Sequence, residues 1–558
     1  MTAKACRQKA EGTSSCILQP LDTSSLTFVG GSRAPWAISC IIAVAVGLGG
    51  CGGGGGTADA SGDILLIVVD TLRADYVGAY GSECATPNID GLAARGITFT
   101  RAYSHIPITG PSHSSLFTAL LPFEHAVHNN GQILDPQFRT LAEILGDDGR
   151  STAAVVSLGV LKRKFGLDRG FDVYGDRFGH DWMKDAGQVN EEVFEILDRG
   201  LARPYFLWVH YSDPHEPYAP PELEYPQIAL ELNGEPIGEL SAGGRSSHFD
   251  LELQPGVNEV RFFDTSSKER QRYRFTNIRV PKKSIEVLPP KEWKIRKKRV
   301  GRPAYQGALP ATFELLNSKD RSLSVVLETA CKRVLTKEEI RRNYALEVEY
   351  VDRQIGHLLD GMRERGLLND ALIVFASDHG EGLGEHNHVG HINQLYDALL
   401  RVPLILSQPG RLPEGLVVEQ PVRLVDVLPT IADLYELPTP DTVSGASLLP
   451  LIAGAEEVTR PVFGITYRPE AYSDKEAVVA RGFKYIHSRT DDREWEELYD
   501  LESDPEELVD LVPSAPPILN ELRAILRMRL AGSSMATVNE AELSEEEIER
   551  LRALGYIH

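Results

Sequence analysis

The chain has 558 residues, of which 42% are hydrophobic and 25% are charged. This is the composition of a folded protein, and its length corresponds to about two to four domains around one large core. The formal net charge of −22 disfavours nucleic acid as the main partner, because a polyanion is repelled by such a surface.

The N-terminal segment has the pattern of an export signal. Arg33 precedes the run APWAISCIIAVAVGLGG, which ends just before Cys51. The run is too short and too rich in glycine to span a bilayer comfortably, and it is typical of a secretory signal. The ending LGGC resembles a bacterial lipoprotein signal, so we expect a signal peptide at 1–50, lipid attached to Cys51 and a flexible tether at 51–62. The alternative is a retained membrane anchor. We therefore predict an exported, membrane-anchored lipoprotein of the periplasm or cell surface.

Apolar runs alternate with helical patterns in two separate parts of the chain, 63–224 and 333–455. The predicted strands are DILLIVVD, STAAVVS and PYFLWVH in the first part, and ALIVFASD and VPLIL in the second. Three segments are predicted to be helices: TLAEILGDDG, a long amphipathic segment that starts EEIRRNYALEVEYV, and VDVLPTIADLYE. This alternation predicts one α/β domain with a mostly parallel sheet and crossover helices.

The region between these parts, 225–332, changes character. It contains short alternating strands such as IALELNG and YRFTNIRV with Gly, Pro and Asn turns. This pattern is typical of a small β-sandwich, inserted here at a surface loop. Further strands and a helix at 456–535 predict a C-terminal subdomain, and 536–558 is predicted to be a charged tail helix.

A basic stretch lies within this inserted region. Residues 268–302 hold 14 Lys or Arg residues and 3 Glu residues. A solvated strand face is one interpretation, and a patch for an anionic polymer or for lipid headgroups is the other. In the second case Trp293 and Tyr273 would add stacking for sugars.

Outside the signal, Cys84 and Cys331 can pair or stay as free thiols, and no Cys-x-x-Cys zinc pattern is present.

Acidic and imidazole side chains follow two of the predicted strands. Asp70 ends DILLIVVD, and Asp378 and His379 end ALIVFASD. An aspartate after a strand is by itself typical of a cap or turn. Ligands of open α/β sheets, however, bind at the carboxyl ends of the strands, and two carboxylates with an imidazole suit a divalent cation.

Thr109 has two interpretations. Pro111 predicts the first turn of a helix over 112–120, so that Thr109 lies just outside its N-terminus. Free N–H groups and the helix dipole favour an anion there. Thr109 is therefore either a helix cap or a nucleophile that attacks an anionic ester.

Three histidines accompany these residues. His113 lies one turn into the predicted helix, His215 follows the strand PYFLWVH, and His391 follows His379 in the sequence. Together they favour an anion site or a second metal.

Nine segments in order support a family resemblance. They are VVDTLRADYVGAYG, TPNIDGLAARGITFTRAYS, TGPSHSSLFTALLPFEHAV, HYSDPHEPYAPP, YVDRQIGHLLDGMRERG, SDHGEGLGEH, RVPLIL, DVLPTIADL and ELYDLESDPEE. With them the chain resembles the sulfatase family of the alkaline phosphatase superfamily. The resemblance implies a large α/β sandwich with a smaller C-terminal antiparallel sheet. It also implies that Asp70, Asp378 and His379 bind the metal together with Thr109, the nucleophile, and that His215 and His391 contact the ester.

The departures from the family pattern bear on the chemistry. Typical sulfatases have Cys-x-Pro-x-Arg or Ser-x-Pro-x-Arg, whose first residue becomes formylglycine, whereas this chain has Thr109, Pro111 and His113. No formylglycine is expected from threonine. Thr71 stands where sulfatases carry a second aspartate. Fewer carboxylates and more imidazoles favour zinc or manganese, with calcium as an alternative. A threonine in this setting is similar to the nucleotide pyrophosphatase/phosphodiesterases and the phosphoethanolamine transferases, which work through a phosphorylated threonine.

These observations predict a metal-dependent hydrolase of a phosphate or sulfate ester, with phosphate favoured, that uses Thr109 as nucleophile and His113, His215 and His391 in catalysis. Its anionic substrate is expected to be a glycan or a lipid headgroup. The alternatives are a sulfatase of a glycan, a phosphoethanolamine-type transferase, or a glycan-binding lipoprotein without catalysis.

Overall fold

The computed structural model describes residues 62–545 and 547–548, with gaps at 180–181, 266–270, 281, 297–303, 456–459, 469–471 and 533–536. The predicted signal peptide, Cys51, nearly all of the predicted tether and residues 536, 546 and 549–558 of the predicted tail helix lie outside this part. The prediction of a helix is wrong for residues 537–544, which are not helical. Within it, no helix combines the length and the apolar character that crossing a membrane requires.

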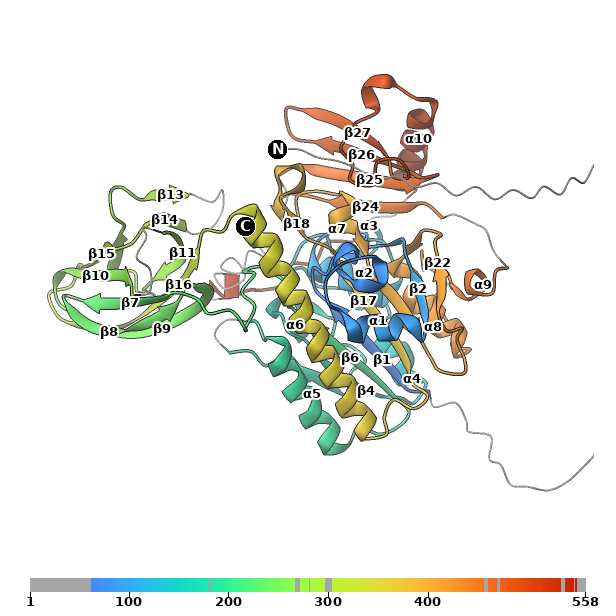
Figure 1. Ribbon diagram of the computed structural model, residues 1–558, viewed down its shortest axis with the longest axis horizontal. Helices are drawn as coiled ribbons and strands as arrows, with labels where there is room; N and C mark the ends of the chain where they lie inside the picture. Colours follow the sequence, from blue (N-terminus) through green and yellow to red (C-terminus); the bar gives the residue numbers. More distant parts are fainter. Residues whose placement is uncertain are drawn as a thin grey trace, which may run out of the picture. The chain divides into compact units, whose positions relative to one another are not determined.

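An eight-stranded sheet forms the centre of the α/β part (Figure 1). At its middle, β1 (Ile64–Val69) pairs in parallel with β17 (Leu372–Ser377) and with β6 (Tyr205–Tyr211). The strand order is β22-β2-β21-β17-β1-β6-β4-β5, and β21 alone runs antiparallel to its neighbours. The mostly parallel sheet is therefore confirmed. The other bounds are β2 Ile97–Phe99, β4 Ser151–Val155, β5 Val173–Gly175, β21 Leu404–Ser407 and β22 Leu416–Val418.

Helices cover both faces of this sheet. Alternate side chains of its buried strands point to opposite sides, so each face is apolar and packs against helices. Leu65 and Ile67 of β1 pack toward α1 (Pro87–Ala94), α5 (Ala186–Gly200) and α6 (Lys337–Glu364). Leu66 and Val68 pack toward α2 (Thr109–Thr118), α4 (Leu141–Asp147) and α8 (Val427–Leu434). Capping boxes at Thr140, Asp185 and Thr336 fix the starts of α4, α5 and α6.

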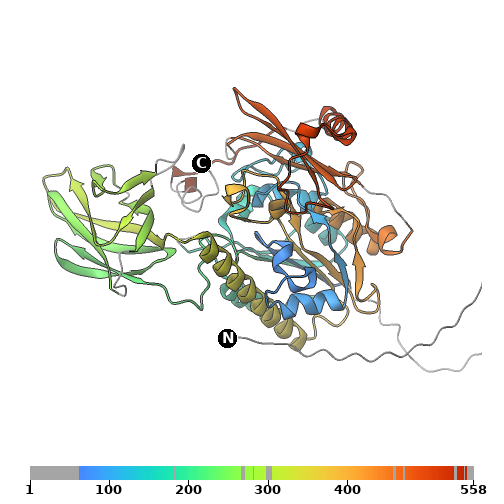
Figure 2. The same ribbon diagram turned by 45° about the horizontal axis from the view of Figure 1, so that its top comes forward.

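The inserted region consists of two five-stranded sheets that share one apolar core (Figure 2). Their orders are β12-β15-β10-β7-β8 and β13-β14-β11-β16-β9. The predicted sugar stacking by Trp293 and Tyr273 is wrong, because these side chains are 5% and 0% exposed within that core. The bounds are β7 Gln227–Leu232, β8 Glu235–Ser241, β9 Gly243–Leu253, β10 Gly256–Asp264, β11 Arg272–Arg279, β12 Ile285–Leu288, β13 Lys294–Arg296, β14 Ala304–Ala308, β15 Ala311–Asn317 and β16 Leu323–Arg333.

The C-terminal subdomain is an antiparallel sheet of β24 (Val462–Thr466), β25 (Asp474–Ala480), β26 (Phe483–Arg489) and β27 (Glu494–Asp500). Arg481 and Gly482, both with positive φ, form the tight turn between β25 and β26. Helix α10 (Pro517–Ala531) packs on this sheet, and the same apolar cluster includes Ile106 and Ile108. The subdomain therefore supports the segment that leads into Thr109.

The short elements are β3 Ala102–Tyr103, β18 Gly382–Leu383, β19 Val389–Gly390, β20 Arg401–Val402, β23 Val422–Arg423, α3 Pro122–His125, α7 Asp397–Leu400 and α9 Leu449–Ile452. Cys84 and Cys331 are both free thiols.

Candidate active site

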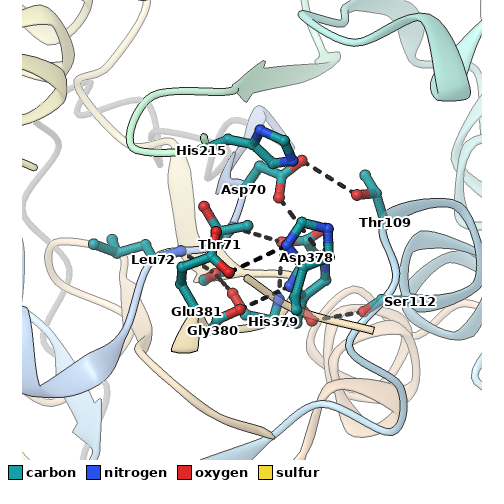
Figure 3. A network of polar contacts seen from close by, with 12 residues as sticks. Asp70, Thr71, Leu72, Thr109, Ser112, His215, Asp378, His379, Gly380 and Glu381 are labelled. Atoms are coloured by element: carbon teal, nitrogen blue, oxygen red, sulfur yellow. Dashed lines mark hydrogen bonds and ion pairs between the residues drawn. The ribbon is translucent and has the colours of Figure 1, made fainter. Parts of the chain in front are cut away.

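Three adjacent parallel strands end at one point of the sheet. Asp70 follows β1, Asp378 and His379 follow β17, and His215 lies in the loop after β6. The register aligns Val69 at the end of β1 with residues at the ends of both neighbouring strands. The topology therefore brings these side chains together, as Figure 3 shows.

Thr109 approaches this group from α2. The helix begins at Thr109 itself and not at residue 112, so Thr109 is its first residue, and the extended Ile108 precedes it. The Thr109 hydroxyl donates to Oδ2 of Asp70 at 3.3 Å. As the side chain points to Asp70 and accepts no backbone N–H, Thr109 is not a helix cap.

Helix α2 is buried along its whole length although it is rich in hydroxyl residues. Ser114 donates to the carbonyl of Gly110 at 2.9 Å, and Thr118 donates to the carbonyl of Ser114 at 2.6 Å. Ser112 donates to the carbonyl of Asp378 at 2.7 Å. These bonds satisfy the buried hydroxyls and join the helix to the end of β17.

The residues after β1 and β17 fit a divalent cation. Ligand atoms of Asp70, Asp378 and His379 all lie within 4.8 Å of one another, and all three side chains are fully buried. Asp70 Oδ1, Asp378 Oδ2 and His379 Nε2 make no hydrogen bond. Buried acceptors that converge without a donor are costly, and a cation compensates that cost.

The electrostatics of these groups agree with that interpretation. Burial and the nearby charges of Asp378 and Glu381 raise the pKa of Asp70 well above its usual range. Burial also raises the pKa of Asp378 to about 6 and lowers the pKa of His379 to about 3. Burial disfavours the charged form of all three groups. A bound cation offsets this for the two carboxylates and binds His379 in its neutral form.

A second donor group adjoins the first and shares Asp378 with it. Ligand atoms of His113, His210 and Asp378 also lie within 4.8 Å of one another. The Nδ1 atom of His113 lies 2.8 Å from the carbonyl oxygen of Thr109 and 3.6 Å from Oδ2 of Asp378. His210, whose Nδ1 atom lies 2.8 Å from the Ser157 hydroxyl, was not predicted. The feature of the sequence that could have identified His210 is a histidine inside the otherwise apolar and aromatic strand β6.

His215 and His391 lie together, with ring centroids 5.1 Å apart, and the His391 ring is 4.8 Å from that of His379. The Oε1 atom of Glu381 is 3.3 Å from Nδ1 of His391. Burial raises the pKa of Glu381 to about 7 and lowers that of each of these two histidines to about 4. Glu381 was not predicted as a site residue, although it directly follows the Asp378-His379-Gly380 segment.

Asn130 is another residue that the sequence did not single out. Its Oδ1 accepts the Gly110 N–H at 2.9 Å, and its buried Nδ2 makes no hydrogen bond. An amide donor beside the first turn of α2 is suited to an anionic oxygen. Asn130 comes from a loop about twenty residues after Thr109, so only the fold brings it here.

Thr71 is held in a strained conformation. Its φ is +58°, which is uncommon for a β-branched residue. Its N–H donates to Oδ1 of Asp378 at 3.2 Å, and its carbonyl accepts the Tyr344 hydroxyl at 2.7 Å. These bonds hold the turn after β1 against Asp378.

Most of the chain matches a known protein family. Residues 63–437 match the family profile described as Sulfatase, which is more than half of the chain. The chain belongs to the sulfatase family. Residues 384–534 also match the profile described as N-sulphoglucosamine sulphohydrolase, C-terminal. Members of this family are ester hydrolases that generally use a divalent metal.

Individual relatives cover most of the chain. Choline-sulfatase of Rhizobium meliloti is 27% identical over 507 residues, covering 86% of this chain and 88% of the relative. N-acetylglucosamine-6-O-sulfatase of Bacteroides thetaiotaomicron is 23% identical over 510 residues, covering 84% and 86%. The solved phosphonate monoester hydrolase of Agrobacterium radiobacter shares the fold with a TM-score of 0.55, at 20% identity, covering 87% and 98%.

Proposed function

We propose that this member of the sulfatase family hydrolyses phosphate esters in a metal-dependent reaction with Thr109 as covalent nucleophile. The observation that supports this most is the position of the Thr109 hydroxyl, at the N-terminus of α2 and 3.3 Å from Oδ2 of Asp70. The donor group that fits a cation includes this same Asp70. Threonine is not the residue from which the family makes formylglycine, so direct displacement at phosphorus is the chemistry open to it.

The metal would be held by Asp70, Asp378, His379 and the hydroxyl of Thr109, with zinc or manganese favoured by this donor set. When bound, it lowers the pKa of that hydroxyl and offsets the charge of the ester. Nδ2 of Asn130 is placed to donate to an oxygen of the ester that does not react, and His215 and His391 would donate to the others in their protonated form, which a bound anion favours.

In the first step Oγ1 of Thr109 bonds to phosphorus, and its proton passes to Oδ2 of Asp70. The alcohol oxygen leaves with the bonding electrons and takes a proton from water. In the second step the resulting hydroxide attacks phosphorus, and the bond to Thr109 breaks. Asp70 then returns the proton to Oγ1, which restores the residue.

A screen of the purified protein tests this proposal. It uses 4-nitrophenyl phosphate, bis(4-nitrophenyl) phosphate and 4-nitrophenyl sulfate, each with zinc, manganese and calcium. We expect the highest turnover on a phosphate ester with zinc or manganese, and radiolabel from that ester on Thr109 after an acid quench. Absence of turnover on every ester with every metal would refute the proposal.

Sulfate ester hydrolysis is the second candidate, because the sequence relatives named above are sulfatases. Higher turnover on 4-nitrophenyl sulfate would favour it. Turnover that yields a new ester when an acceptor alcohol is added would instead favour a transferase.

The N-terminal pattern supports a further proposal on location. We infer that Cys51 carries lipid and anchors the mature protein to a membrane outside the cytoplasm.

A further inference from the structure

One face of the inserted domain presents a row of cations. On β11, Tyr273 and Phe275 point into the apolar core, so Arg274 between them points to the outer face. The register places Arg274 opposite Gln306 of β14 and Lys332 of β16, and it places Gln306 opposite Lys294 of β13. Residues directly opposite one another share a face of the sheet.

This row crosses four strands. Adjacent strands lie about 4.8 Å apart, so the row from Lys294 to Lys332 is roughly 14 Å long. Arg272 lies two positions before Arg274 and therefore points to the same side. Arg272 and Lys294 are exposed, whereas the side chain of Lys332 is only 19% exposed. We call Arg272, Arg274, Lys294 and Lys332 the basic face.

The basic face ends at the loop that carries His215. The ammonium group of Lys332 pairs with the carboxylate of Glu216. Glu216 directly follows His215, whose Nδ1 atom lies 2.7 Å from the carbonyl oxygen of Glu216. Lys332 is the main cause that lowers the pKa of Glu216 to about 2, and Arg274 and His215 act in the same direction. The Lys332–Glu216 pair thus connects the basic face to the loop that carries His215.

Packing at the same place fixes this junction. A Cβ atom added to Gly244 of β9 would lie 2.8 Å from Cβ of Pro217, the residue after Glu216, and 3.4 Å from Cβ of Lys332. The φ of Gly244 is +94°, a conformation in which a side chain would be strained. This position at the edge of the sheet therefore requires glycine. The insert is therefore packed closely against the loop that carries His215.

We propose that the basic face is a subsite for further anionic groups of the substrate, so that the enzyme acts on a polyanionic glycan and not on a small isolated ester. This inference rests on the proposed ester hydrolase function. Cations beside the loop that carries His215 bind best to a chain whose charges continue beyond the ester that is cleaved. A membrane surface is the less suitable partner, because it is flat and cannot follow the row to the buried His215.

Binding of dextran sulfate to the full chain tests the subsite directly, with uncharged dextran and phosphatidylglycerol vesicles as comparison ligands. The variant Arg272→Gln/Lys294→Gln removes two exposed charges of the basic face. The matched control, Lys319→Gln/Arg321→Gln, removes two exposed charges from the turn before β16. That turn is roughly 30 Å along the strand from Lys332.

We expect the first variant to bind dextran sulfate at least tenfold more weakly and with a smaller salt dependence, and the control to bind like the parent. Dextran sulfate should also inhibit small-ester hydrolysis by the parent competitively, with a Ki at least tenfold weaker in the first variant. Equal loss in both variants, equal binding of uncharged dextran, or preferential binding of the vesicles would overturn the proposal. So would binding at the basic face that does not compete with the small ester.

The two proposals fail separately. If the parent hydrolyses no ester, the proposed function is refuted, while the binding arms still show whether the basic face takes a sulfated glycan. If the parent hydrolyses an ester but the face variant binds dextran sulfate like the parent, only the subsite is refuted.

Discussion

The hydroxyl of Thr109 donates to Oδ2 of Asp70 at 3.3 Å, and this contact joins the first turn of α2 to the end of β1. Both side chains are fully buried. The contact links the nucleophile that we propose to the group that fits a cation.

Thr109→Ala should therefore reduce turnover of the best ester by several orders of magnitude and remove covalent labelling. The loss of one buried hydrogen bond should cost about 1 kcal/mol of unfolding free energy, so the fold persists. Thr109→Ser keeps a hydroxyl and should retain part of the turnover. Kinetics and denaturant unfolding of both variants check this, and near-normal turnover of Thr109→Ala would exclude the nucleophile assignment.

Asp378→Asn should lower the content of bound metal. The change keeps the shape of the side chain but removes a negative charge from the buried donor group of Asp70 and His379. Elemental analysis should show less metal than in the parent, and chelation should lower the melting temperature of the parent more than that of the variant. Asp360→Asn on the exposed side of α6 is the control, and metal content equal to the parent in both variants would contradict the assignment.

The sequence predicted the parts of this site that follow strongly apolar strands. DILLIVVD and ALIVFASD are unmistakable as buried strands, and polar residues directly after parallel strands meet at one edge of the sheet. This reasoning located Asp70, Asp378 and His379. Parallel pairing and the two-sheet insert were likewise readable from the alternation of apolar and polar residues.

Other parts depend on tertiary contacts that no local pattern encodes. Pro111 was interpreted as marking the first turn of a helix over 112–120, whereas the helix begins at Thr109 and Pro111 is its third residue. Proline is tolerated throughout a first turn whose N–H groups need no partner in the helix. Asn130 joins the site through a loop. Trp293 and Tyr273 alternate with charged residues, and sequence alone does not show which face of a strand is buried.

The proposed lipid anchor gives a further prediction. Cys51→Ser should abolish labelling of the protein by a radioactive fatty acid, because no thiol remains for the lipid at that position. The variant should also be released from the membrane fraction or accumulate as an uncleaved precursor. Cys84→Ser, outside the signal pattern, is the control and should label like the parent. Persistent labelling of Cys51→Ser would place the anchor elsewhere.

A buried ion cluster joins the C-terminal sheet to α7, and breaking it is expected to be costly. The fully buried ammonium group of Lys484 contacts the carboxylates of Asp397 and Glu507. Burial lowers the pKa of Lys484, but these two carboxylates outweigh that effect, so the pKa is raised overall. Burial raises the pKa of Glu507 to about 7, although Lys484 acts in the opposite direction.

Lys484→Met removes the cation and leaves both carboxylates without it, which should cost about 3–5 kcal/mol of unfolding free energy. The sign of the pH dependence follows from Glu507. Without Lys484 its pKa in the folded state rises further above that in the unfolded state, so stability is lost as pH rises through the folded value. Denaturant unfolding should therefore show a larger deficit at about pH 8 than at about pH 5. Lys319→Met, at an exposed position of the insert, should cost less than about 0.5 kcal/mol at either pH. A deficit in Lys484→Met as small as in that control would show that the ion cluster does not stabilise the subdomain.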